Sequence, residues 1–225
     1  NQAVTDMARK SKEVFESQKQ FIENASHELQ TPLSVIQSRL EALIGQAELT
    51  GKQASIIEGI IVSTQRIKKL NKTLLLLSKI ENKQFLLNEK VDIKEIIDKS
   101  LEFFEEHKEA LHLQMSLDTT DCLIIQGNAL LSEILVQNLL KNAFMHNIQK
   151  GSISIACDRQ KLTIGNTGRS MPLDQDKIFS RFYKKSDNPE TWGLGLAIAY
   201  KITQASRWSL KYAKHSDQHV FEVLF

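Results

Sequence analysis

The stretch Phe21–Leu43, FIENASHELQTPLSVIQSRLEAL, determines how the amino-terminal part of the chain is expected to fold. Its apolar residues recur with the spacing of heptad positions a and d, and two more occupy position e. This spacing predicts a long amphipathic helix with one apolar seam. The seam residues are Ile22, Ala25, Leu29, Ile36 and Leu43 at a and d, and Leu33 and Leu40 at e.

The same pattern resumes after a turn that has a glycine at each end, Gly45 and Gly51. Two long helices joined by a short loop predict an antiparallel hairpin. Because one hairpin has a seam but little core, we expect a second copy to complete a four-helix bundle about a two-fold axis. The apolar residues of the second helix are Ile60, Ile67, Leu70, Leu74 and Leu77.

Length and composition exclude several classes of protein. The 225 residues suffice for one large or two small domains, and 41% hydrophobic with 25% charged residues is ordinary for a globular protein. A net charge of +2 is too small to indicate nucleic-acid binding. No apolar run approaches the ~20 residues that span a bilayer. Cys122 and Cys157 lack metal-ligand spacing, so we expect no disulfide and a reducing compartment.

After Asn82 the pattern changes to short alternating stretches mixed with helices. Strands and helices follow one another without a regular βαβ rhythm, so the fold class expected here is an α+β sandwich with helices over one face of a sheet. The expected helices are 92–111, opened by a capping box of Asp92 and Glu95, then 128–144 and 194–205. The expected strands are 113–117, 122–125, 153–157 and 162–164, with two more closing the chain at Phe225.

His27 falls at heptad position f, the position farthest from the seam. Thr31 lies four residues later on the same face, and Glu28 is the adjacent residue. Pro32 removes a backbone donor inside the helix, which costs about 3 kcal/mol, and such a broken local rule often marks a functional site. Taken alone, His27 is better explained as a solvated surface histidine.

Two further motifs have the chemistry of a nucleotide site. Asn138 and Asn142 share one helix face, and their amide oxygens can bind Mg²⁺ while phosphates supply the charge. Gly193 and Gly195 stand at the entry to a helix, where free N–H groups bind phosphate oxygens. Exposed asparagines and glycine-rich helix starts are common, so each motif is weak by itself.

In order and spacing these motifs resemble those of the histidine kinases. The ATP-binding domain of that family is of the GHKL type, shared with the gyrase, Hsp90-type chaperone and mismatch-repair ATPases. The resemblance covers nearly the whole chain from about Phe21. The phosphoacceptor box is SHELQTPL (26–33), the asparagine box LVQNLLKNAFMHN (135–147), the first glycine box IGNTGRSMP (164–172), the phenylalanine box IFSRFYK (178–184) and the second glycine box WGLGLAI (192–198).

The resemblance implies a sensor histidine kinase core of a two-component system. The chain would then be an ATP-dependent protein-histidine kinase, a phosphotransferase that places the γ-phosphoryl group of ATP on His27 and passes it to an aspartate of a response regulator. A neutral imidazole is a good nucleophile near pH 7, and Glu28 is placed to accept its proton. Thr31 would help to dephosphorylate the regulator by orienting a water molecule.

For the nucleotide, the resemblance implies ATP and Mg²⁺ in the second domain, with the metal held by Asn142 and Asn138. A lid of about residues 184–192, anchored by Phe179 and Phe182, would close over the phosphates. Lys184, Lys185 and Arg181 are candidate charge donors, although the two lysines are as well explained as surface residues. The full expected nucleotide set is Asn138, Asn142, His146, Asn166, Gly168, Arg181, Lys184, Gly193, Leu194, Gly195 and Leu196.

The chain departs from the family pattern at three places. Asn166 replaces an aspartate, Ser170 replaces a glycine, and Met145 with His146 stands where the family often has Lys-Tyr or Arg-His. A neutral amide can accept through its oxygen, but it can also flip and donate. We therefore expect weaker ATP affinity, and poorer discrimination between ATP and GTP, than an aspartate at position 166 would give.

The expected domains are the end of an upstream signalling helix (1–20), the phosphotransfer hairpin (21–83) and the ATP-binding domain (84–225). The expected partners are a second copy and a receiver domain, without nucleic acid. The chain would be the cytoplasmic portion of an inner-membrane sensor, attached through an upstream segment. Two alternatives stay open: a non-catalytic dimeric scaffold with a degenerate nucleotide domain, and an ATP hydrolase of the same fold. Hydrolysis is disfavoured because Asn138 cannot act as a base.

Overall fold

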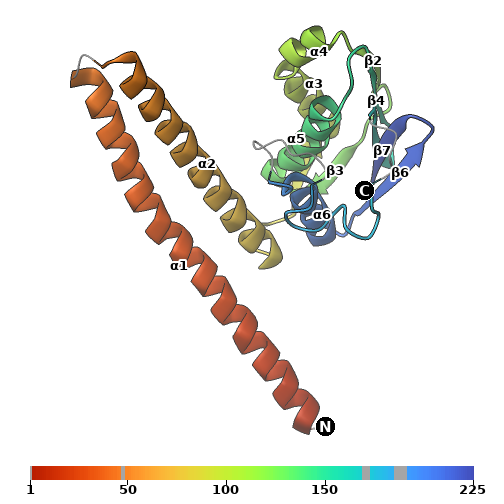
Figure 1. The fold of residues 1–225 in the computed structure, drawn as a ribbon. Coiled ribbons are helices and arrows are strands. Elements are labelled where there is room, and N and C mark those ends of the chain that lie inside the picture. The colour runs from red at the N-terminus through yellow and green to blue at the C-terminus, as the bar shows by residue number, and fades with distance from the viewer. Residues whose placement is uncertain (1, 47–48, 169–172, 185–191) are drawn as a thin grey trace. The chain divides into compact units, whose positions relative to one another are not determined.

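The structure is a computed structural model that describes residues 2–46, 49–168, 173–184 and 192–225 (Figure 1). It divides into two compact units, Asn1–Asn82 and Lys83–Phe225. Within the described residues, we find no helix that combines the length and the apolar character needed to cross a membrane.

The first unit is a hairpin of two helices, α1 (Gln2–Gln46) and α2 (Gly51–Glu81). Helix α1 continues through Pro32 without interruption. Thr50 caps α2 with a capping box, in which its hydroxyl accepts the N–H of Gln53 at 3.4 Å and the Gln53 side chain accepts the N–H of Thr50 at 3.0 Å. The predicted hairpin is therefore confirmed.

The buried side of the hairpin differs from the predicted seam. Leu33, from position e, is 7% exposed, and the buried residues of α2 repeat every seven positions at Ile57, Thr64 and Asn71. Leu77 of α2, one of the expected seam residues, is 1% exposed and is buried as predicted. Five other expected seam residues are 42–48% exposed, because the helices face each other about one heptad position away: Leu29, Ile36 and Leu43 on α1, and Ile60 and Ile67 on α2.

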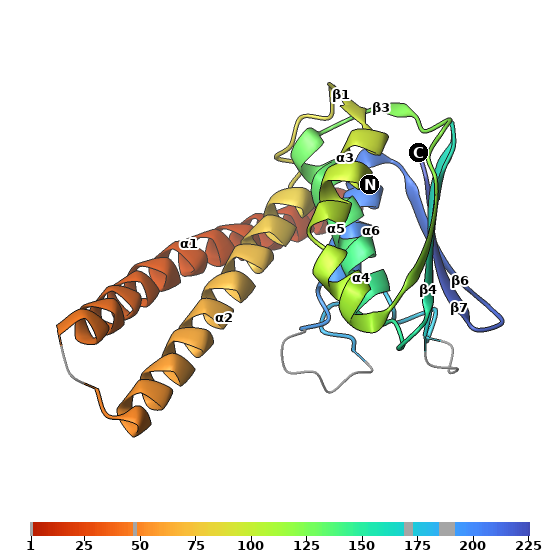
Figure 2. The same cartoon turned by 90° about the horizontal axis from the view of Figure 1, so that it is seen from above.

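The second unit is an α+β sandwich, as predicted. A five-stranded sheet has the order β2-β4-β5-β7-β6, with β2 parallel to β4 and every other neighbouring pair antiparallel. The helices cover one face of this sheet, as Figure 2 shows edge-on. The elements are β1 (Glu89–Asp92), α3 (Ile93–Glu102), α4 (Glu105–Leu111), β2 (Gln114–Asp118), β3 (Ile124–Gly127), α5 (Ala129–Met145), β4 (Ser152–Cys157), β5 (Lys161–Thr167), α6 (Gly195–Ser206), β6 (Ser209–His215) and β7 (Gln218–Leu224).

The core of this unit lies between α5, α6 and the sheet. Helix α5 contributes a continuous apolar face, and alternate residues of the central strands meet it because side chains of a strand alternate between the two faces of the sheet. At most 1% of each of these side chains is exposed: Leu131, Leu135, Leu139 and Phe144 on α5, and Ile153, Ile155, Leu162, Ile164, Phe221 and Val223 on the sheet.

Two details of the sequence prediction are wrong. The helix expected over 92–111 breaks at Phe103 and Phe104 into α3 and α4, because the Phe104 ring stacks on Phe144 of α5 with centroids 4.6 Å apart. The expected strand 122–125 begins two residues later as β3, and it pairs with the unpredicted β1 outside the main sheet.

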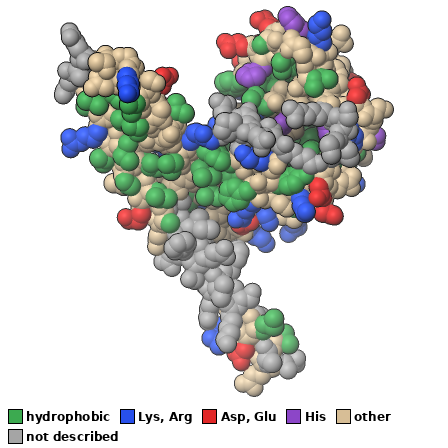
Figure 3. Space-filling model, in the orientation of Figure 1, with side chains coloured by type: hydrophobic (Ala, Val, Ile, Leu, Met, Phe, Trp, Pro, Cys, Tyr) green, Lys and Arg blue, Asp and Glu red, His purple; other side chains and the backbone are tan. Residues whose placement is uncertain are grey.

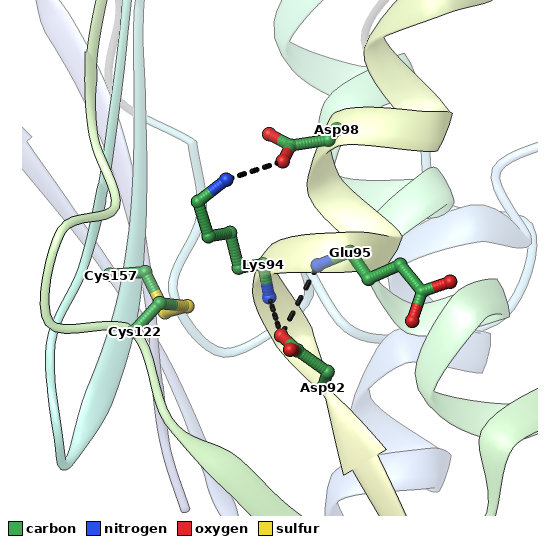
Figure 4. Close-up of polar contacts among 6 residues, drawn as sticks. All are labelled: Asp92, Lys94, Glu95, Asp98, Cys122 and Cys157. Atoms are coloured by element: carbon green, nitrogen blue, oxygen red, sulfur yellow. Dashed lines mark hydrogen bonds and ion pairs between the residues drawn. A yellow bond between two sulfur atoms is a disulfide. The ribbon is translucent and has the colours of Figure 1, made fainter.

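The expectation of no disulfide is also wrong. Cys122 is bonded to Cys157, with Cα atoms 4.8 Å apart, which is an ordinary spacing for a disulfide. The cause is topological: β2 runs parallel to β4, so the turn after β2 returns to the end of β4 that carries Cys157. Figure 4 shows this bond beside the start of α3, where the Asp92 carboxylate accepts the N–H of Lys94 at 2.9 Å and of Glu95 at 3.2 Å.

Candidate functional site

The acceptor candidate lies on α1. The backbone of His27 is part of that helix, but its side chain lies outside the described residues, so its exposure stays a prediction. The side chains of Glu28 and Thr31, which follow His27 by one and four residues, are exposed. This part of α1 therefore offers a carboxylate and a hydroxyl to solvent within about one helical turn of His27.

Helix α5 carries the two candidate metal ligands. Asn128 caps this helix by accepting the N–H of Leu131 at 3.1 Å, and the helix then turns its leucines to the sheet and leaves Asn138 and Asn142 half-buried. The Asn138 amide donates to the carbonyl of Ile134 at 2.8 Å, so its Oδ1 remains available as an acceptor. Amide oxygens of this kind suit Mg²⁺ when phosphates supply the negative charge.

Asn138 also touches the start of α6. A methyl group placed on Gly195 would come within 2.9 Å of Asn138 Oδ1, so the asparagine box and the second glycine box meet there. Among the described residues, no group of three or more His, Cys, Asp or Glu side chains could hold a metal. A divalent cation at this place could be held by amide oxygens together with the phosphate oxygens of a nucleotide.

The amino terminus of α6 has the backbone chemistry to bind an anion. Leu194 is its N-cap and supplies no side-chain hydrogen bond, so the first N–H groups receive no cap from that residue. Gly193 has φ of +65°, and a side chain there would collide with the backbone of Phe182 and Tyr183. Glycine is thus required at 193 by conformation and by space, and the helix end can accept phosphate oxygens.

Asn166 supplies a buried acceptor on β5. Only 1% of this residue is exposed, and its Nδ2 donates to the carbonyl of Thr167 at 2.8 Å. Its Oδ1 has no hydrogen-bond partner among the described residues. A buried acceptor left alone costs about 1–3 kcal/mol. Because the amide nitrogen is already engaged, the oxygen is the atom left to accept a hydrogen bond, and a donor such as a purine amino group would suit it.

His146 ends α5 near the same part of the sheet. Its backbone N–H donates to the carbonyl of Asn142 at 3.1 Å. Part of the residue is exposed, yet burial of the ring and the neighbouring His219 both lower the pKa of its imidazole. His146 is therefore held in its neutral form near pH 7, when it can either donate or accept one hydrogen bond.

The phenylalanine box directly precedes the expected lid. The Phe179 ring stacks on Tyr200 of α6 with centroids 5.0 Å apart. Phe182 is 56% exposed with φ of 63°. The anchoring of the lid by these two rings stays a prediction, because residues 185–191 lie outside the described residues. Arg181 and Lys184 are exposed, and their nucleotide contacts stay predictions. Ser170, Lys185 and residues 185–191 of the expected lid lie outside the described residues.

Three polar residues beside Asn166 were not predicted from the sequence. Tyr212, Lys214 and His219 lie on β6 and β7, and the Tyr212 hydroxyl is 2.8 Å from His219 Nδ1. No motif marks them. The alternation of these strands could have found them, since Tyr212 follows Leu210 and His219 precedes Phe221 at a spacing of two, which places all four on the buried face.

Comparison with known proteins adds independent findings. Residues 17–83 match the family described as the His Kinase A (phospho-acceptor) domain, and residues 127–223 match the histidine kinase-, DNA gyrase B-, and HSP90-like ATPase family. The chain is 32% identical over 199 residues to the "Heme sensor protein HssS" of Staphylococcus saprophyticus, covering 85% of this chain and 42% of that protein. The chain thus spans less than half the length of this relative.

Solved structures give a consistent result. The Acinetobacter baumannii histidine kinase AdeS aligns with a TM-score of 0.62 and 25% identity, covering 88% of this chain and 96% of that one. Full-length ShkA in complex with AMPPNP aligns with a TM-score of 0.71 and 18% identity, covering 90% of this chain and 44% of that one, and shows likeness of fold alone.

Proposed function

The chain belongs to the sensor histidine kinases of two-component systems, and we propose that it phosphorylates itself on His27 with ATP and passes the phosphoryl group to a response regulator. One observation carries the proposal: an acceptor hairpin and an ATP-binding domain occur together in one chain. A protein that only bound nucleotide would not need the first, and a passive dimerisation module would not need the second.

The nucleotide is bound by groups that the fold brings together on α5, α6 and β5. Asn166 Oδ1 accepts a hydrogen bond from the adenine amino group. This removes the free-energy cost of leaving the buried oxygen without a hydrogen-bond partner. The uncapped start of α6, with Gly193, Leu194, Gly195 and Leu196, donates N–H groups to the phosphates. Asn138 and Asn142 would hold Mg²⁺, which would neutralise charge on the triphosphate. His146, Gly168, Arg181 and Lys184 complete the site.

For phosphoryl transfer, the main task of the protein is to position the reacting groups. An imidazole nitrogen of His27 forms the new N–P bond while the bond from the γ-phosphorus to the ADP oxygen breaks, and ADP leaves. Glu28 accepts the imidazole proton as charge develops. Holding the two reactants in line supplies most of the rate enhancement. Thr31, which is exposed one turn later, orients a water for dephosphorylation of the regulator.

The hairpin forms a homodimer through its exposed apolar stripe. We define this stripe as Leu29, Ile36, Leu43, Ile60 and Ile67, each 42–48% exposed. Figure 3 shows apolar side chains gathered along this part of the hairpin. Burying the stripe against a second copy would complete a four-helix core, and a receiver domain would dock near His27. In this proposal the chain is the cytoplasmic portion of a membrane-anchored sensor.

The test is incubation of the chain with γ-labelled ATP and Mg²⁺. Phosphohistidine is stable to base and labile to acid, so the expected label has both properties and is absent from His27→Gln. A matched control is His215→Gln, on the exposed end of β6, which should label like the wild type. If wild-type protein gained no label even at millimolar ATP, the chain would instead be a non-catalytic scaffold.

A further inference from the structure

A row of polar side chains crosses three strands beside the proposed adenine site. Asn166 on β5 is directly opposite His219 on β7, and His219 is directly opposite Lys214 on β6. Residues that are directly opposite in an antiparallel pair project from the same face, with Cβ atoms roughly 5 Å apart. Asn166, His219 and Lys214 therefore lie side by side on the face of the sheet that the helices cover.

The contacts of His219 favour one tautomer of its neutral ring. Lys214 Nζ lies 3.4 Å from Nε2, and an ammonium group can only donate, so Nε2 is the acceptor. The proton of the neutral ring is then on Nδ1, which donates to the Tyr212 hydroxyl at 2.8 Å. The backbone N–H of Leu173 donates to the same hydroxyl oxygen at 3.2 Å. Burial raises the pKa of Tyr212, so this hydroxyl stays protonated and neutral.

The pair of His219 and Tyr212 contacts the chain at two places that follow Asn166, namely Gly168 and Leu173. At one side, a methyl group on Gly168 would come within 2.8 Å of His219 Cδ2, so the ring edge lies directly against that glycine. At the other side, Leu173 is held by the Tyr212 hydroxyl. A buried polar pair thus supports both Gly168 and Leu173.

We propose that His219, held by Tyr212 and Lys214, is a positioning residue for the purine base. It acts indirectly, by fixing Asn166 and Gly168 at the wall of the adenine site. This inference rests on the proposed function, since it assumes that Asn166 reads the base. Only 8% of His219 and 9% of Tyr212 are exposed, so both are buried well enough to hold a fixed position. Their effect reaches the nucleotide through the neighbouring Asn166 and Gly168.

The experiment compares His219→Leu, which removes both ring nitrogens, with His219→Asn, whose amide N–H can replace Nδ1–H toward Tyr212. His215→Leu is the control on the exposed end of β6. For each protein we would measure KM and kcat of autophosphorylation with ATP and with GTP, together with the thermal midpoint of unfolding.

We expect His219→Leu to raise KM for ATP about tenfold, as for loss of one buried polar contact, and to reduce the preference for ATP over GTP. Its kcat should change little, and His219→Asn should restore most of both losses. Unchanged KM and ATP preference in His219→Leu would overturn the inference. An equal loss in both variants would also overturn it, because the defect would then follow from packing alone. Failure of the wild type to bind any nucleotide would refute the proposed function instead.

Discussion

Replacement of Asn166 by leucine separates the function of this residue from its place in the core. The side chain has one satisfied atom, Nδ2, bonded to the Thr167 carbonyl, and one unsatisfied atom, Oδ1. Leucine has the same branched arrangement of heavy atoms, although its methyl groups are larger, and it removes both polar atoms. The gain from deleting the lone acceptor and the cost of leaving the Thr167 carbonyl unpaired are each about 1–3 kcal/mol, so they nearly cancel in the free protein.

In the complex with ATP, these two free-energy terms no longer cancel. In Asn166→Leu the adenine amino group would be buried without an acceptor, which costs roughly 2–3 kcal/mol, or about 30-fold to 150-fold in Kd for ATP. GTP, which presents a carbonyl at the equivalent place, should lose less. Calorimetric titration with both nucleotides gives the affinities, and thermal unfolding of the free protein should show a small change. Asn88→Leu, at an exposed asparagine, is the control. Unchanged ATP affinity in Asn166→Leu would refute the assignment.

The structure also sharpens the comparison with aspartate at this position. A carboxylate is a stronger acceptor than an amide, so Asn166→Asp should bind ATP more tightly and more selectively than the wild type. The same carboxylate cannot donate to the Thr167 carbonyl and is 1% exposed, so the free variant should be less stable. Tighter and more adenine-selective binding by the wild type would contradict this expectation.

Three further predictions concern the dimer, the disulfide and pH. Ile36→Asp should weaken dimerisation about a hundredfold, because a carboxylate would enter the apolar stripe. Light scattering measures the dimer dissociation constant. The control Ser38→Asp, at an exposed site two residues away, should dimerise like the wild type. Cys122→Ser should lower the free energy of unfolding by about 4 kcal/mol in denaturant titrations, because the disulfide closes a loop with a 35-residue separation. Its ATP affinity should be unchanged. An unchanged free energy of unfolding would refute a structural role for the disulfide. The free energy of unfolding should fall as pH drops below about 6.5, because His146 is protonated in the unfolded chain at a higher pH than in the folded chain. In His146→Gln the free energy of unfolding, measured at a series of pH values, should depend less steeply on pH.

The sequence predicted the elements best where a local signal was strong. Asn128 and Asp92 are capping residues whose partners lie within three positions, and the structure has α5 and α3 starting directly after them. The alternation of Ile153, Ile155 and Cys157 likewise predicted β4. These signals depend on neighbours in the chain, which the sequence displays directly.

The failures share a different cause, namely contacts between distant segments. Heptad phase alone cannot tell which face of a helix meets its own hairpin partner and which meets a second copy, so Leu33 rather than Leu29 is buried. The Cys122–Cys157 bond depends on the parallel pairing of β2 with β4. The pair of Tyr212 and His219 likewise depends on the register of β6 and β7, which no motif records.

The central claim is that His27 receives the phosphoryl group. Peptide mapping by mass spectrometry under neutral conditions, after incubation with ATP and Mg²⁺, tests it most directly. The account predicts one phosphorylated peptide, with fragmentation that places the group on His27. Phosphorylation found only on a serine, threonine or another histidine, or an unmodified chain that nevertheless binds ATP, would contradict it.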